Sequence, residues 1–158
     1  MLKHMTPRRA AFTVFILAAG TLAGALLFEF YGYAPCELCL KQRWAYYAAI
    51  PLSLALALLA RNNPALARNG LYLMALLMLA SAIFGAYHAG VEWKFWPGPS
   101  TCSGGGALSA LPDLSKPTVI CDEPAIRILG ISLAGWNALV SAVLAIVALK
   151  GARSRFRA

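Results

Sequence analysis

Cys36 and Cys39 form a CxxC pair, the usual arrangement for reversible dithiol chemistry. The second thiol of such a pair can resolve a mixed disulfide that forms at the first one. Arg43 follows Cys39 by four residues, so on a helix that begins near Cys39 the two side chains share one face. A guanidinium group and a helix N-terminus both favour the thiolate form of a nearby cysteine. Alternatively, Arg43 is an interfacial arginine that only extends its charged group toward water.

Cys102 and Cys121 form a second pair in a later and longer loop. A zinc site of four cysteines is disfavoured because this second pair lacks the close spacing of a zinc knuckle, and we expect no metal. A c-type haem site would require histidine directly after Cys39, where Leu40 stands. Two static disulfides stay open as an alternative, since a bridge across the longer interval would stabilise the protein by about 3 kcal/mol in the chain-entropy model. The CxxC spacing favours redox function.

The composition indicates an integral membrane protein. Of the 158 residues 60% are hydrophobic and only 13% are charged, which leaves too little polar surface for a soluble globule of this size. Spanning the hydrocarbon core takes about 20 helical residues, and the apolar runs lack the period-two alternation of barrel strands. We therefore predict an all-α integral membrane protein, a four-transmembrane-helix bundle in a single domain. Its helices are expected over about residues 10–30, 40–60, 71–91 and 125–149.

The basic residues predict the orientation of these helices, because positively charged segments tend to stay cytoplasmic. Nine of the 14 lysines and arginines lie near the two ends of the chain or between the second and third helices. Both termini are therefore expected inside, and the loops over about 31–42 and 92–124, which hold the cysteines, outside. The net charge of +8 is then a topology signal, and nucleic acid is not expected as a partner. The first apolar run is long for the core of a cleaved signal peptide, so its retention is expected.

Further polar residues lie near the outer ends of the predicted helices. His88, with Glu92 one turn later, is either a polar cap or reaches the same pocket as Arg43. Glu29 is interpreted as an interfacial residue. The sequence has no glycine-rich fingerprint for a flavin or nicotinamide, so the electrons of a thiol oxidase need another acceptor. A membrane-soluble quinone is accessible to a bundle in lipid, and we expect it where Cys39 and Arg43 meet the bilayer.

The ordered combination of these motifs resembles the DsbB family of disulfide bond formation proteins in bacterial inner membranes. Pro35-Cys36-x-x-Cys39 is followed by Arg43 at the family spacing, and a second cysteine pair lies in the longer outer loop. The Pro-x-Pro-Ser-Thr segment before Cys102 is similar to the one with which that family engages its partner. The resemblance covers most of the chain and includes the four spans with both ends inside.

This resemblance implies a protein-disulfide:quinone oxidoreductase that supports disulfide bond formation. Cys102 and Cys121 would accept electrons from a reduced DsbA-like thioredoxin-fold oxidase in the periplasm, with Cys102 in the mixed disulfide. The electrons would then pass to Cys36 and Cys39, with Cys39 next to a ubiquinone or menaquinone. Active loops in the periplasm and a multi-pass anchor in the inner membrane follow from the same resemblance.

Two residues are expected at the quinone site. Arg43 would stabilise the thiolate or the negative charge that develops on the reduced ring. His88 matches a quinone-pocket position of the family. Lys41 and Gln42, directly before Arg43, depart from the family pattern and add a second cation near the cysteine pair.

Other classes of protein fit parts of the pattern. Vitamin K epoxide reductase-like proteins also join a CxxC to a loop pair and a quinone, but there the loop pair precedes the CxxC, whereas here it follows. A DsbB paralogue dedicated to one substrate oxidase is compatible with the same motifs. A non-enzymatic membrane subunit or transporter with two structural disulfides is the alternative from a different class.

Overall fold

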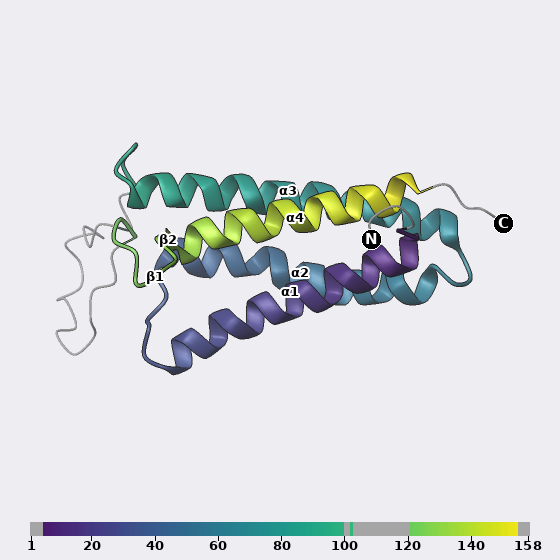
Figure 1. The fold of residues 1–158 in the computed structure, drawn as a ribbon, viewed down its shortest axis with the longest axis horizontal. Coiled ribbons are helices and arrows are strands. Elements are labelled where there is room, and N and C mark those ends of the chain that lie inside the picture. Colours follow the sequence, from purple (N-terminus) through teal and green to yellow (C-terminus); the bar gives the residue numbers. More distant parts are fainter. Residues whose placement is uncertain (1–4, 100–101, 103–120, 155–158) are drawn as a thin grey trace, which may run out of the picture.

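The computed structural model describes residues 5–99, 102 and 121–154. These residues form helices α1 (Pro7–Phe30), α2 (Glu37–Leu59), α3 (Pro64–Glu92) and α4 (Leu133–Arg153), and a hairpin of strands β1 (Arg127–Ile128) and β2 (Ile131–Ser132). The helices pack side by side in an antiparallel bundle (Figure 1). The start of α1, the end of α4 and the turn between α2 and α3 lie at one end, and the β-hairpin and the start of α2 lie at the other.

Part of the predicted outer loop over 92–124 lies outside the described residues, namely 100–101 and 103–120. The segment before Cys102 that resembles the partner-engaging segment of the DsbB family is therefore described only up to Pro99. Three of the basic residues used for the orientation, Lys3, Arg155 and Arg157, also lie outside the described ranges.

Helix α3 begins earlier than the prediction of 71–91, because a capping residue precedes its apolar part. Asn63 is the N-cap, and its Oδ1 accepts the Leu66 backbone N–H at 3.0 Å. Pro64 occupies the first helical position, where its missing N–H costs nothing. Hydropathy detects only the apolar part of a helix, so this polar first stretch was assigned to the linker.

Helix α4 begins at Leu133, later than the predicted 125–149, because a β-hairpin precedes it. Leu129 and Gly130 have φ angles of 53° and 81°, and positive φ at two successive residues is what a type I′ hairpin turn requires. Ser132 ends β2 and caps α4, since its Oγ accepts a backbone N–H of the first turn at 3.2 Å. The predicted all-α fold class and the helical bundle are confirmed, with this short hairpin added before α4.

Within the described residues, α1, α3 and α4 are long and apolar enough to cross a membrane, whereas α2 does not meet the same criteria. The first turns of α2 carry Glu37, Lys41 and Arg43, and its uncharged part extends only from Trp44 to Leu59. That part is shorter than the roughly 20 residues that a span requires. A membrane bundle is therefore supported, and the fourth span stays a prediction.

The side chains of the bundle are arranged as expected for a protein in lipid. Small residues line much of the interior, and large apolar side chains point outward from the helices. In water so much exposed apolar area would be unfavourable. In a membrane the same side chains contact lipid tails, which are themselves apolar. Examples with more than half of the side chain exposed are Phe12, Leu73, Leu76, Ile83 and Ile146.

The contact between α3 and α4 depends on Gly85. A Cβ atom at this position would lie 2.9 Å from the backbone nitrogen of Ala138 and 3.0 Å from its Cα. We expect Gly85→Ala to destabilise the protein by about 1–3 kcal/mol, because the two helix backbones must move apart. Thermal unfolding in detergent measures this effect.

Gly20→Ala is the matched control, because a Cβ there meets no atom of the described residues within 4 Å. Alanine also has the better helix propensity, so the control should be neutral or slightly stabilising. Equal unfolding temperatures for the Gly85→Ala and Gly20→Ala proteins would contradict the assignment of Gly85 to a close helix contact.

Candidate active site

The CxxC pair lies at the N-terminus of α2. Cys36 is the N-cap residue, with extended backbone angles, and its Sγ accepts the backbone N–H of Cys39 at 3.1 Å. The two cysteines form a disulfide with a Cα–Cα distance of 5.0 Å. The helix therefore begins at Glu37, earlier than the predicted start near Cys39. Because the free N–H groups of the first turn point toward Cys36, a thiolate on Cys36 is stabilised by the helix N-terminus.

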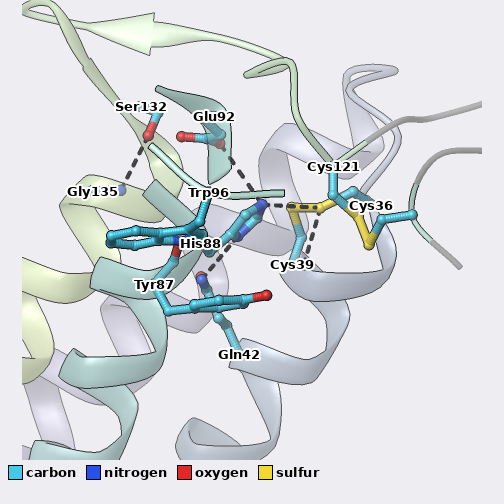
Figure 2. Close-up of polar contacts among 11 residues, drawn as sticks. Cys36, Cys39, Gln42, Tyr87, His88, Glu92, Trp96, Cys121, Ser132 and Gly135 are labelled. Carbon is cyan, nitrogen blue, oxygen red and sulfur yellow. Dashed lines mark hydrogen bonds and ion pairs between the residues drawn. A yellow bond between two sulfur atoms is a disulfide. The ribbon is translucent and has the colours of Figure 1, made fainter. Parts of the chain in front are cut away.

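The second pair, Cys102 and Cys121, is also a disulfide, and it packs against the first. Both of its cysteines are buried, and they form one cluster with Cys36 and Leu38. Figure 2 shows Cys121 beside Cys36, although the two residues are far apart in the sequence. The tertiary structure therefore brings the two pairs together at the same end of the bundle.

An ion pair joins the segment after Cys121 to the end of α3. Lys94 pairs with Asp122, and this hydrogen bond is the main reason why the pKa of the Asp122 carboxyl is lowered below its usual value. Because Asp122 directly follows Cys121, the contact helps to hold the second disulfide near α3 and α2.

His88 contacts the other side of Cys36. Its ring is buried, with Nε2 at 3.6 Å from Cys36 Sγ and Nδ1 at 3.0 Å from the side-chain amide of Gln42 (Figure 2). The backbone of Cys121 also lies near the ring. Glu92 lies one helical turn later, with Oε1 at 3.9 Å from His88 Nε2. His88 therefore touches both cysteine pairs, which the sequence did not reveal.

Arg43 extends toward α1. One guanidinium nitrogen lies 2.5 Å from Oε2 of Glu29, and the other lies 3.4 Å from the carbonyl oxygen of Ala25. Only 11% of the Arg43 side chain is exposed. The sequence analysis missed Glu29 as a partner, although it is the sole acidic residue of the first apolar run. Lys41, by contrast, pairs with Glu37 at 2.6 Å on an exposed face, so the added cation does not point at the cysteines.

A cavity of about 230 Å³ lies next to the CxxC pair. Cys36, Cys39, Gln42 and Arg43 line it from α2, together with Glu92 from α3. The remaining lining is mostly apolar and comes largely from α1 and α4, and it includes Leu22, Ala25, Phe28, Leu133 and Val140. His88 is not among the lining residues, but it contacts Gln42, Cys36 and Glu92, which are.

Together these features define a class of protein, a membrane bundle that holds two adjacent disulfides at one end. Residues 7–150 match the family described as Disulfide bond formation protein DsbB, and the chain belongs to this family. Family membership supports a role in disulfide bond formation, as the resemblance implied. No solved structure matches the chain.

Relatives in three bacteria are similar along most of the chain. Disulfide bond formation protein B of Albidiferax ferrireducens is 32% identical over 157 residues, which cover 91% of this chain and 86% of that protein. Disulfide bond formation protein B 1 of Pseudomonas fluorescens is 34% identical over 155 residues, with 89% and 85% covered. An uncharacterized protein of Rickettsia prowazekii is 31% identical over 143 residues, with 85% and 79% covered.

Proposed function

We propose that this protein is a protein-disulfide:quinone oxidoreductase of the bacterial inner membrane. It would reoxidise a periplasmic DsbA-like dithiol oxidase and pass the electrons to a membrane quinone. The observation that carries the proposal is the contact between the two disulfides, one of which also borders an apolar cavity. An electron relay requires that the two disulfides touch and that one of them borders the acceptor site. Two purely structural disulfides require neither.

The electrons would pass through two successive thiol–disulfide exchanges. A thiolate of the reduced partner attacks Cys102, and its second thiolate then completes the partner's disulfide, which leaves Cys102 and Cys121 as a dithiol. This dithiol attacks the Cys36–Cys39 disulfide in the same way and is reoxidised. Cys36 suits the entry of electrons because it is buried against the second pair. Cys39, which is only half-buried and lines the cavity, suits their exit.

The cavity fits the head of a quinone. Its volume is below the range of about 300–1,000 Å³ for drug-sized ligands, so it suits one substituted ring while an apolar tail extends into lipid. A bound quinone supplies the acceptor for the two electrons and two protons of the reduced CxxC. Arg43 is held at the wall of the cavity by Glu29 and places its positive charge there. Such a fixed charge stabilises negative charge that develops on an acceptor or on a thiolate.

His88 would act on the quinone site indirectly, through a residue that lines the cavity. The ring hydrogen-bonds the Gln42 amide, and Gln42 itself lines the cavity. We propose that His88 holds Gln42 in position and also contacts Cys36. It acts as a positioning residue for the quinone in this arrangement.

The arrangement of charges supports the proposed orientation. Arg8, Arg9, Arg61, Lys150 and Arg153 lie at or near the end of the bundle opposite the disulfides. Because positively charged segments tend to stay cytoplasmic, this end would face the cytoplasm and the cysteine pairs the periplasm. The proposal includes one membrane domain with four spans and both termini inside.

The test is turnover by the purified protein in detergent. A reduced DsbA-type partner and a soluble ubiquinone analogue are added, and quinone reduction is followed together with the loss of partner thiols. We expect one quinone reduced for each partner disulfide formed. A protein with only static disulfides, such as a transporter subunit, would reduce no quinone. Reduction with one partner oxidase and not with others would indicate a dedicated paralogue.

A further inference from the structure

Three side chains around the first disulfide, those of Cys36, Cys39 and His88, have metal-ligating atoms that all lie within 4.8 Å of one another. We propose that reduction of the Cys36–Cys39 disulfide creates a site for Zn²⁺ formed by these two cysteines, His88 and Glu92. The proposal goes beyond the quinone reaction, because it requires only that the CxxC pair can be reduced. It also departs from the expectation of no metal that follows from the sequence.

The ligands come in two closely spaced pairs. Cys36 and Cys39 give a C-x2-C spacing at the start of α2, and His88 and Glu92 are one turn apart at the end of α3. Structural zinc sites typically combine a C-x2–4-C pair with a second pair three to five residues apart. Residues i and i+4 of a helix lie on one face, so His88 and Glu92 can bind the same ion.

The distances suit tetrahedral coordination. Zn–S and Zn–N bonds of about 2.3 Å and 2.0–2.1 Å place a sulfur and a nitrogen ligand about 3.6 Å apart across a tetrahedral angle. Nε2 of His88 lies 3.6 Å from Cys36 Sγ. The corresponding nitrogen-to-oxygen separation is about 3.4 Å, and Oε1 of Glu92 lies 3.9 Å from Nε2. Glu92 falls outside the group of ligand atoms that lie within 4.8 Å of one another, so its side chain must turn toward the cysteines to complete the site.

Glu92 gives an independent indication of a missing ligand. Only 5% of its side chain is exposed, and Oε2 has no hydrogen-bond partner within the part of the chain that the structure describes. A buried polar atom without a partner is costly and calls for an explanation. Ser132 and the positive charge of Arg127 also act on this carboxyl group. Once the carboxylate has turned toward the cysteines with Oε2 as the ligand, a cation would satisfy this unpartnered oxygen.

The surroundings of the four ligands provide both access and orientation. Cys36, Cys39 and Glu92 all line the cavity, which gives an ion a path to the site. Gln42 lies 3.0 Å from Nδ1 of His88. In the structure the amide nitrogen of Gln42 faces Nδ1. With the amide turned so that its oxygen faces the ring, Gln42 would accept the Nδ1 proton and leave the Nε2 lone pair for the metal, and zinc-binding histidines usually make such a second contact.

Binding would be controlled by the redox state of the cysteine pair. Zn²⁺ displaces the two thiol protons and forms two zinc–thiolate bonds, so electrons are neither gained nor lost. The disulfide form has no thiolates and cannot bind in this way. While zinc is bound, both cysteines are held as ligands, and their oxidation stops until the ion is removed. Zinc would therefore act as a reversible inhibitor of the reduced protein.

The test uses the full chain with Cys102→Ser and Cys121→Ser, so that the CxxC is the sole thiol pair. This protein is reduced with a phosphine and titrated with Co²⁺, whose visible absorption reports tetrahedral thiolate ligation, and then with Zn²⁺. We expect one equivalent to bind in the reduced state and none in the oxidised state. His88→Ala and Glu92→Gln should each weaken binding by about ten- to a hundredfold.

Glu37→Gln, which removes a carboxylate that pairs with Lys41 on an exposed face and lies outside the proposed ligand set, should bind Co²⁺ like the parent. Equal binding by oxidised and reduced protein, no thiolate–cobalt absorption after reduction, or full affinity in both the His88→Ala and Glu92→Gln variants would each overturn the proposal. A second readout leaves His88 and Glu92 unsubstituted: bound Zn²⁺ should protect the cysteines of the reduced parent from an alkylating reagent. Quinone turnover is measured separately without metal, so failure of the zinc site leaves the redox proposal intact.

Discussion

Replacing Cys39 with serine is expected to lower quinone reduction by more than about 100-fold, because the two-electron oxidation of the CxxC ends in a disulfide that needs both sulfurs. Cys36→Ser should have the same effect. Both cysteines line the cavity, and Cys36 also packs against the second pair. Stopped-flow measurement of ubiquinone reduction by the reduced partner tests this expectation. Wild-type rates in either variant would refute the relay.

The two halves of the relay can be separated with a small dithiol. The Cys102→Ser, Cys121→Ser protein should lose activity with the DsbA-type partner but still oxidise dithiothreitol with quinone, because the CxxC lines an accessible cavity. The retained dithiothreitol activity is also the control for folding, since the loss of a disulfide can itself destabilise the protein. Normal turnover with the protein partner would show that Cys102 and Cys121 form only a structural bridge.

Arg43→Ala is expected to raise the KM for quinone by about ten- to a hundredfold. The estimate corresponds to the loss of one charged hydrogen bond, about 1.5–3 kcal/mol. The exchange of disulfides with the partner should change much less, because the contacts of Arg43 are with α1 and the cavity, and not with the second cysteine pair. Steady-state kinetics with varied quinone, at saturating partner, separate the two effects.

Lys41→Ala is the matched control for Arg43→Ala. It removes a cation two residues away on the same helix, but Lys41 pairs with Glu37 on an exposed face. We expect its KM for quinone to stay within about twofold of the parent, as is usual for exposed ion pairs. Glu29→Gln should have an intermediate effect, because it releases the guanidinium without removing its charge. An unchanged KM in Arg43→Ala would leave Arg43 as an interfacial residue.

The general type of site was predictable from local sequence. A CxxC spacing, an arginine one turn later and a second cysteine pair are short-range patterns, and their chemistry depends mainly on residue type. The apolar runs predicted a helical membrane bundle, because burial in lipid requires long uninterrupted segments. The ends of the helices were less accurate, since they depend on Asn63, Ser132 and the turn at Leu129 and Gly130 more than on hydropathy.

The sequence by itself determined the candidate reactive residues, the long apolar helices and the family to which the chain belongs. The tertiary structure decided which side chains meet: His88 against Cys36, Glu29 against Arg43, and the second disulfide against the first. Each of these contacts joins residues on different elements, and its partners depend on how the helices pack and rotate against one another. A single sequence specifies that packing only through the whole set of side chains, so no local pattern could reveal it.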